Sequence, residues 1–178
     1  MVNQMSRSIP PILVMGVQGS GKSTIGMMLA EKLGITFLDG DSLHSPENVA
    51  KMAAGIPLDD ADRMPWLAQI GNILATERHS GIIVACSALK RRYRDLIRDS
   101  APDLFIVHPE GPIELIAARI SIRQHEYMPA TLLSSQYAIL EPRALDERGV
   151  TVDISCEPSA VIDAVAIALA VGSPTRTR

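Results

Sequence analysis

The chain has 178 residues, of which 47% are hydrophobic, 21% are charged and 3% are aromatic, and its formal net charge is −3. At about 150 residues per domain, this length favours a single domain over residues 1–178. The apolar share is typical of a soluble protein with a real core and argues against a disordered or membrane-embedded chain. The acidic balance and the few aromatic rings argue against a nucleic-acid partner. We expect any bound anion to be small and locally held.

The cysteines and the N-terminal residues bear on the compartment. Cys86 and Cys156 lie far apart without a CxxC pattern, so neither a disulfide framework nor a zinc site is predicted. The first ten residues hold no apolar run long enough for a signal peptide, and residues 164–171 are too few to cross a bilayer. We therefore expect a cytoplasmic protein without a membrane partner.

Apolar runs alternate with helical patterns along the chain. The first run, residues 9–15, ends at a glycine-rich turn, and apolar residues at helical spacing follow it as far as Gly34. Further strands are predicted at residues 35–38, 82–86, 104–107 and 150–154. Helices are predicted at residues 46–55, 62–76 or 62–79, 88–98, 112–123 and 159–171. This order predicts an α/β fold: a five-stranded parallel sheet with helices on both faces.

Two segments do not fit this alternation. Residues 124–141 are polar and punctuated by proline, with one short helical stretch at 131–140, and this composition favours a mobile lid over a core element. The tail, residues 173–178, is predicted to be disordered.

The turn after the first strand carries a specific motif. Residues 16–23 read GVQGSGKS and fit the pattern GxxxxGK[ST]. Glycines of this pattern let backbone N–H groups curl around phosphate oxygens, while Lys22 reaches the β and γ phosphates and Ser23 can ligate Mg²⁺. The sequence therefore predicts that ATP or GTP is bound by Gly16, Gly19, Ser20, Gly21, Lys22, Ser23 and Thr24.

The rest of the chain limits the class of phosphate-loop protein. A signalling GTPase needs an NKxD guanine reader, which this sequence lacks, and the DxxG letters at residues 146–149 precede a late strand instead of ending an early one. A motor or ATPase would usually end an apolar strand with an acidic residue, whereas the run at residues 82–86 leads into Ser87 and Ala88. Neither class is favoured.

Asp39 and Asp41 instead follow the second predicted strand. The carboxyl ends of parallel strands share one edge of a sheet, so both carboxylates are expected beside the γ-phosphate. We predict that Asp39 holds the hydration shell of Mg²⁺ and that Asp41 orients an attacking hydroxyl or accepts its proton. The alternative is a simple Asp-Gly turn. His44 is either a substrate contact or a loop histidine.

Several blocks of sequence point to one family. They are GVQGSGKST, FLDGDSLH, KMAAGIPLDDADRMPWL, CSALKRRYRDLIR and HEYMPATLLSSQ followed by LEP. Together they resemble the small P-loop gluconokinases, which are related to shikimate and adenylate kinases. The resemblance implies a P-loop kinase fold and ATP-dependent phosphorylation of D-gluconate at its 6-hydroxyl to give 6-phospho-D-gluconate, and it leaves a homodimer open. The chain departs from the family's GHF pattern at residues 123–127, so His125 and Glu126 are assigned no role.

Gluconate is a carboxylate, so the substrate pocket implied by this resemblance needs a cation or a cluster of donors. The segment around Arg63 covers the acceptor in related kinases, and Arg63 is therefore a candidate. Three further candidates lie in the basic run after the third strand: Lys90, Arg91 and Arg94. Arg92 and Arg98 are expected on a solvated face.

Arg119 and Arg123 lie four residues apart, on one helical face just before the predicted lid. Arginines so placed in the related kinases stack on adenine and reach the transferred phosphate, which implies an adenine contact for Arg119 and a lid arginine at Arg123. The alternative is a pair of surface arginines. Trp66 is expected to pack. Two rival functions remain: a kinase of shikimate or another small hydroxy acid, and a nucleotide-binding switch without phosphotransfer, against which the paired aspartates argue.

Overall fold

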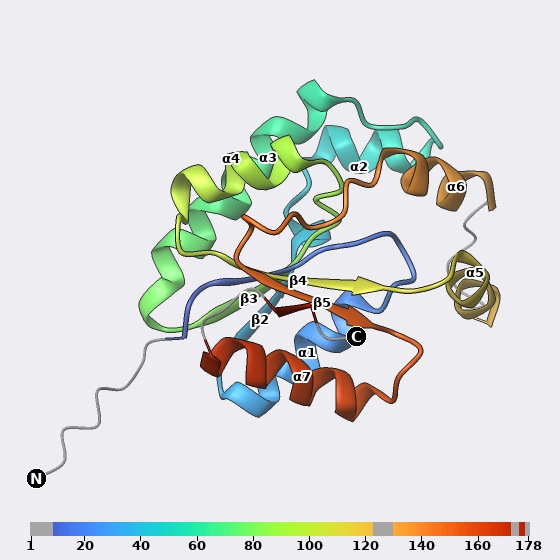
Figure 1. Cartoon of the computed structure of the whole chain (residues 1–178). Helices are drawn as coiled ribbons and strands as arrows, with labels where there is room; N and C mark the ends of the chain where they lie inside the picture. The colour runs from blue at the N-terminus through green and yellow to red at the C-terminus, as the bar shows by residue number, and fades with distance from the viewer. Residues whose placement is uncertain (1–8, 123–129, 172–174, 177–178) are drawn as a thin grey trace, which may run out of the picture.

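The computed structural model describes residues 9–122, 130–171 and 175–176. Within these ranges the strands form one parallel sheet in the order β2-β3-β1-β4-β5-β6 (Figure 1). The strands are β1 (Ile12–Val14), β2 (Thr36–Asp39), β3 (Ile82–Ala85), β4 (Phe105–Glu110), β5 (Gly149–Asp153) and β6 (Thr175–Arg176). The parallel sheet predicted from the alternating pattern is therefore confirmed, and β6 is an additional strand.

Helices cover both faces of the sheet (Figure 1). On one face lie α1 (Lys22–Leu33) and α7 (Pro158–Val171), and on the other lie α3 (Asp60–Thr76) and α4 (Arg91–Ser100). The remaining helices are η1 (Gly40–Leu43), α2 (Pro46–Ala53), η2 (Glu77–His79), α5 (Ile113–Ile122) and α6 (Ala130–Ile139). In Figure 1, α5 and α6 lie at the carboxyl edge of the sheet, to which β4 points.

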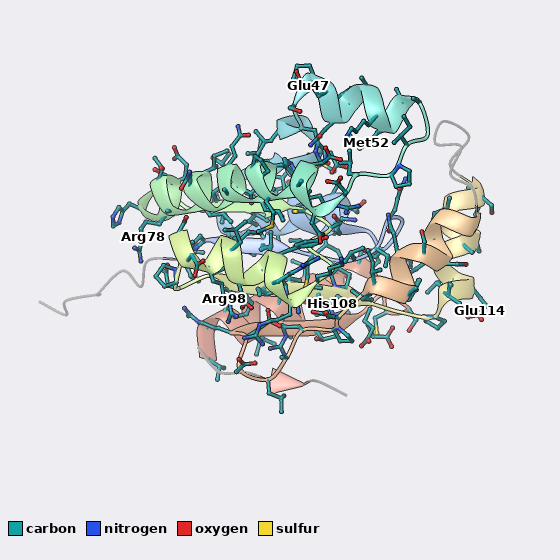
Figure 2. All side chains as sticks on the ribbon, turned by 90° about the horizontal axis from the view of Figure 1, so that it is seen from above. Glu47, Met52, Arg78, Arg98, His108 and Glu114 are labelled. Atoms are coloured by element: carbon teal, nitrogen blue, oxygen red, sulfur yellow. The ribbon has the colours of Figure 1, made fainter. Side chains whose placement is uncertain are left out.

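Two apolar layers make up the core, one on each face of the sheet. Strand residues alternate between them: Leu13 of β1 packs with α3 and α4, whereas its neighbours Ile12 and Val14 pack with α1 and α7. Arg94, His108 and Glu147 are polar exceptions, each at most 1% exposed. Figure 2 shows His108 inside the molecule and Arg78 at its periphery.

The observed strand boundaries differ from the predicted ones for local reasons. β2 begins at Thr36 and not at Ile35, because the Ile35 N–H donates to Ala30 O at the end of α1 (3.0 Å). β4 runs on to Glu110, three residues further than expected. Pairing with β1 ends at Val107, and beyond it the strand pairs only with β5, so Pro109 has no partner strand on its other side.

The tail prediction is wrong for the two described tail residues. Thr175 and Arg176 pair in parallel with Val150 and Thr151 of β5 and extend the sheet. The remaining tail residues lie outside the described ranges. Of the helices in the described ranges, none has the length and apolar content that a bilayer span requires.

Helix starts follow from capping. α3 begins at Asp60, two residues before the predicted start, because the Asp59 side chain accepts from the Asp62 N–H (2.8 Å) and Asp62 reciprocates at the Asp59 N–H. α4 begins at Arg91 and not at Ala88. Ala88 has a positive φ of 39° and Lys90 is extended, so neither can belong to a helix.

Ser87 lies four residues before Arg91 and is not the N-cap of α4. The carboxylate of Glu141 accepts a hydrogen bond from the Arg91 N–H, and the Glu141 N–H donates to Leu89 O (2.8 Å). The chain segment after α6 thus supplies the cap that the sequence around α4 does not contain.

Candidate active site

The turn between β1 and α1 has the conformation that phosphate binding requires. Gly16, Gly19 and Gly21 have φ angles of 140°, 76° and 90°, which favour glycine. A Cβ at Gly19 would lie 2.6 Å from Cγ1 of Ile120, so α5 packs directly against the loop. The loop wraps the first turn of α1, where free N–H groups and the helix dipole attract anions. This geometry fits a nucleotide phosphate.

Two side chains of the phosphate loop, Lys22 and Ser20, are placed to meet a ligand. Lys22 Nζ donates to Val17 O (3.0 Å), which holds the lysine across the loop. Ser20 is fully buried, and its Oγ has no hydrogen-bond partner among the described residues. A buried hydroxyl without a partner is costly, so a ligand oxygen would stabilise it.

Asp39, the last residue of β2, lies beside the phosphate loop. Its Oδ2 accepts from Ser23 Oγ (3.0 Å), and its Oδ1 accepts from the Asp41 N–H (3.1 Å). Ser23 and Asp39, the two predicted Mg²⁺ ligands, are therefore adjacent. No cluster of three or more His, Cys, Asp or Glu side chains suited to a metal occurs in the described parts of the chain. Two protein oxygens suit Mg²⁺, which commonly completes its shell with phosphate oxygens and water.

Gly40 allows β2 to turn sharply into η1. A Cβ at this position would lie 2.6 Å from the carbonyl oxygen of Ala85 on β3. The Gly40 carbonyl in turn accepts from Trp66 Nε1 (2.8 Å) of α3. Asp41 follows in η1 and lines the pocket. The Asp-Gly-Asp sequence is therefore a turn, and this turn brings Asp41 to the site.

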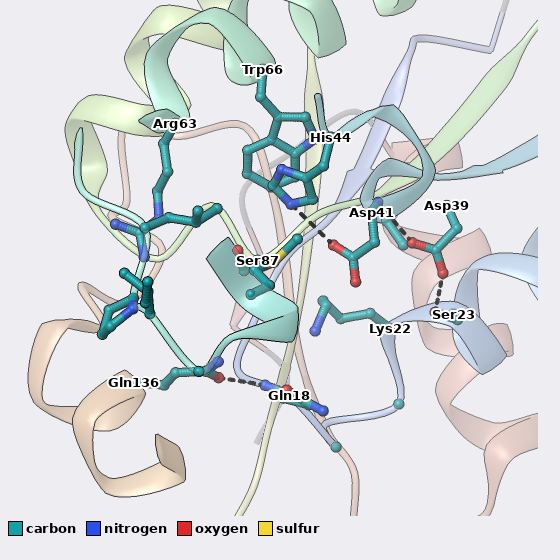
Figure 3. A pocket seen from close by; sticks show the side chains of 18 of the residues that line it. Gln18, Lys22, Ser23, Asp39, Asp41, His44, Arg63, Trp66, Ser87 and Gln136 are labelled. Atoms are coloured by element: carbon teal, nitrogen blue, oxygen red, sulfur yellow. Dashed lines mark hydrogen bonds and ion pairs between the residues drawn. The ribbon is translucent and has the colours of Figure 1, made fainter. Parts of the chain in front are cut away.

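His44 packs between Trp66 and Asp41. Its ring stacks on Trp66, with centroids 4.1 Å apart and planes at 20°, and its Nε2 lies 3.9 Å from Asp41 Oδ1 (Figure 3). Burial lowers the pKa of His44 against the opposing charge of Asp41, which favours a neutral ring. Nδ1 is buried and has no hydrogen-bond partner among the described residues, and Nε2 is the ring nitrogen that faces Asp41.

These residues surround one pocket of about 460 Å³ at the carboxyl edge of the sheet (Figure 3). Its phosphate-loop wall consists of Gln18, Gly19, Gly21, Lys22, Ser23 and Thr24. The opposite side is formed by α2, α3 and the segment between them, through Met52, Gly55, Ile56, Pro57, Leu58, Arg63 and Trp66. Asp39, Asp41, His44, Ala85, Ser87 and Gln136 complete the lining. Lys22 and Arg63 approach the pocket from opposite sides (Figure 3).

The basic run at the start of α4 does not reach this pocket. Arg94 is completely buried, where its Nε and Nη2 donate to the two carboxylate oxygens of Glu147 (2.7 and 2.9 Å). Arg91 makes a bidentate pair with Asp146 (2.9 and 2.8 Å) and also contacts Asp95. Lys90 lies 3.5 Å from Asp60. The prediction that Lys90, Arg91 and Arg94 line the pocket is wrong, because α4 starts late and carboxylates elsewhere in the fold pair with these cations.

The two remaining arginines are placed differently. Arg119 of α5 donates to Ile154 O just after β5 (2.7 Å) and does not line the pocket. Arg123 lies outside the described residues, as does the lid segment 124–129 with His125 and Glu126. Residues 130–141 of the predicted lid are described. There Leu133 is buried in the core, and Tyr137 Oη donates to Gly111 O (3.1 Å).

Sequence reasoning missed two parts of the site. Trp66 packs as expected, but it also lines the pocket and supports His44. Gln136 was not singled out, yet its Oε1 accepts from the Gln18 N–H of the phosphate loop (2.7 Å). A polar side chain in a short helical segment gave the only hint of Gln136, since its partner lies 118 residues away.

Comparisons with known proteins agree with this geometry. A family model described as "Shikimate kinase" matches residues 18–144. A "Probable gluconokinase" of Rattus norvegicus is 42% identical over 80% of this chain and 88% of its own length. The "Thermosensitive gluconokinase" of Escherichia coli (strain K12) is 42% identical over 80% of this chain and 78% of its own.

A solved structure gives the same result in three dimensions. The crystal structure of a gluconokinase from Sinorhizobium meliloti 1021 superposes with a TM-score of 0.85 at 44% identity, covering 93% of this chain and 94% of that one. Sequence blocks, fold and pocket therefore agree, and the chain belongs to the gluconokinase family.

Proposed function

We propose that this protein transfers the terminal phosphoryl group of ATP to the 6-hydroxyl of D-gluconate, giving 6-phospho-D-gluconate and ADP. One observation carries the proposal: a single pocket holds a phosphate loop with Lys22 on one wall and a carboxylate, Asp41, beside an arginine-bearing wall. The names of the relatives, gluconokinases of a mammal and of bacteria, support the same acceptor.

The nucleotide side of the reaction belongs to the phosphate loop. Backbone N–H groups of residues 19–24 and the ammonium of Lys22 would hold the β and γ phosphates, and Ser20 Oγ would bond one of their oxygens. Ser23 and Asp39 would hold Mg²⁺, which when bound neutralises charge on the phosphate oxygens. Arg119 is proposed as a contact for adenine, and Arg123 as a lid arginine near the transferred phosphate.

The acceptor side is formed by Asp41, His44 and Arg63. The 6-hydroxyl oxygen forms a bond to the γ-phosphorus, the bond to the β–γ bridging oxygen breaks, and ADP leaves with that electron pair. Asp41 orients the hydroxyl and accepts its proton. We propose that Nε2 of His44, which faces Asp41, restrains that carboxylate. Arg63, across the pocket from Lys22, would pair with the gluconate carboxylate.

The geometry also explains why a closed pocket matters. Water that reached the γ-phosphate beside Asp41 would be phosphorylated in place of the acceptor, which is hydrolysis of ATP. We propose that residues 124–141 close over the two substrates and exclude that water.

An acceptor panel tests the function directly. Purified protein is supplied with ATP and Mg²⁺, and ADP release is measured with gluconate, shikimate and other small hydroxy acids, while phosphorus NMR identifies the product. We expect turnover with gluconate and the signal of a primary phosphate ester. Faster turnover of shikimate than of gluconate would overturn the acceptor, and nucleotide binding without turnover of any acid would overturn the kinase.

The two aspartates provide a second test of the mechanism. Asp41→Asn should reduce kcat far more than it changes the affinity for ATP, because the proton acceptor is lost. Asp39→Asn should instead raise the Mg²⁺ concentration needed for half-maximal rate. Small and equal effects of both substitutions would contradict these roles.

A further inference from the structure

Gln136 reaches the phosphate loop from the far side of the pocket. It belongs to α6, which is fixed to the body of the protein on one side by Leu133, buried in the core. Near its end, the Tyr137 hydroxyl donates to Gly111 O (3.1 Å). Gln136 lies between these two anchors, so its backbone is held at the edge of the pocket.

The hydrogen bond to Gln18 determines which way the amide group of Gln136 faces. A backbone N–H can only donate, so the atom of the carboxamide that meets the Gln18 N–H is the oxygen (2.7 Å). The amide nitrogen is the other corner of the same planar group. Figure 3 shows the oxygen directed at Gln18, and Gln136 lines the pocket. The anchored oxygen thus leaves the two N–H donors of the amide for another acceptor.

These donors belong to a residue that lines the pocket in which negative charge would move. Gln18 immediately precedes Gly19 in the phosphate loop, and Lys22 and Asp41 line the same pocket. In phosphoryl transfer the charge is spread over the equatorial oxygens of the migrating group, and donors fixed in advance around those oxygens accelerate the reaction. A neutral amide suits this place because it donates without repelling the cations nearby.

We propose that Gln136 is a further catalytic residue, whose amide nitrogen donates a hydrogen bond to an oxygen of the phosphoryl group during its transfer. The inference rests on the proposed function for the direction of transfer. Gln136 takes no proton: the hydroxyl proton goes to Asp41, and the leaving oxygen of ADP keeps the electron pair. Its carbonyl bond to Gln18 serves to aim the donor.

Two substitutions of Gln136 distinguish a donor to the phosphoryl group from a residue that only bonds to the Gln18 N–H. Gln136→Glu keeps an oxygen that can accept from the Gln18 N–H but removes the nitrogen donors, whereas Gln136→Met removes both. We expect kcat to fall about tenfold to a hundredfold in both variants, because one donor to the transition state is lost. The KM values for ATP and gluconate should change less than kcat in Gln136→Met. Matched controls are Gln69→Glu and Gln69→Met on the exposed face of α3, which should keep wild-type kinetics.

A binding measurement gives a readout that does not depend on turnover. Fluoroaluminate, bound between ADP and gluconate, imitates the migrating phosphoryl group. Calorimetry measures the binding of the three ligands to the protein. Gln136→Met should weaken this assembly at least as much as it lowers kcat while leaving the affinity for ADP alone unchanged. Wild-type kcat in Gln136→Glu, or unchanged fluoroaluminate binding in Gln136→Met, would overturn the proposal.

The test of Gln136 can be told apart from the test of the proposed function. If the wild-type protein phosphorylates a different acid of the panel, the gluconate assignment fails. The same variants are then compared with that acid, because the argument for Gln136 concerns the phosphoryl group and not the acceptor.

Discussion

Two groups of cations in this protein have opposite surroundings in the fold. Lys22 and Arg63 line the pocket, where a ligand can meet them. Arg91 and Arg94 of α4 are paired with carboxylates of the chain itself, Arg94 with Glu147 in the interior and Arg91 with Asp146 at the surface. The position of a basic residue in the fold, and not its charge alone, thus decides whether it can serve a ligand. The following predictions sharpen the contrast, starting with the largest effect.

Arg94→Met should destabilise the protein by about 3 to 5 kcal/mol, because Glu147 would be left charged and unpaired in the interior. The free energy of unfolding is measured by urea denaturation. Adding Glu147→Leu to this variant should recover part of the loss, since the pair is then removed as a whole. A loss below about 1 kcal/mol in the single variant would show that Arg94 is not a structural cation.

Lys22→Ala should lower kcat by about a hundredfold or more, because a fixed positive charge on the γ-phosphate oxygens is lost. The fold should survive, as circular dichroism and urea denaturation can check. Activity near that of the wild type would contradict the phosphate-loop assignment.

His108, buried in β4, also predicts a pH dependence of stability. Burial, together with the charges of Arg94 and Arg143, lowers the pKa of His108 to about 4. Between this value and the ordinary 6.5, the unfolded chain binds a proton that the folded protein does not, so stability falls as the pH drops through this window. The loss should reach on the order of 3 kcal/mol near pH 4.

The test compares urea denaturation of the wild type and of His108→Gln at pH 7 and pH 4.5. The difference between the two pH values should be smaller in the variant, since the titrating ring is absent. Identical pH dependences would show that His108 is protonated in the folded protein as readily as in the unfolded one.

The smallest predicted effect is on the KM for gluconate, and it compares Arg63 in the pocket with Arg91 on α4. Arg63→Gln should raise the KM for gluconate by about tenfold or more, since a charge-assisted hydrogen bond contributes about 1.5 to 3 kcal/mol. Arg91→Gln should leave that KM within about twofold and cost at most about 1 kcal/mol of stability, as is usual for a surface pair. Steady-state kinetics of both variants with varied gluconate decide between them. A matching rise in KM for Arg91→Gln would return α4 to the binding site.

The parts of the molecule that sequence could predict are those set by neighbouring residues. The phosphate loop combines glycines, a lysine and a serine within eight positions, and Asp39 and Asp41 follow a strand whose end must lie at the same edge. The partners of α4 could not be read in this way. Arg94 meets Glu147 53 residues later, and no local pattern tells a basic helix which carboxylates will approach it. The site residue Gln136 could not be predicted for the same reason, because its partner Gln18 lies 118 residues away.

The connection between α6 and α4 has a consequence for the phosphate loop. Leu140 packs against both core layers, and Glu141 bonds to Leu89 and to the first N–H of α4. The same 86–90 segment holds the phosphate loop, through the carbonyl of Ser87 and the Gly16 N–H (3.1 Å). The C-terminal end of α6 and the start of the phosphate loop are therefore both hydrogen-bonded to residues 86–90. A substitution that disturbs residues 86–90 should therefore affect the position of α6 and the shape of the phosphate loop together.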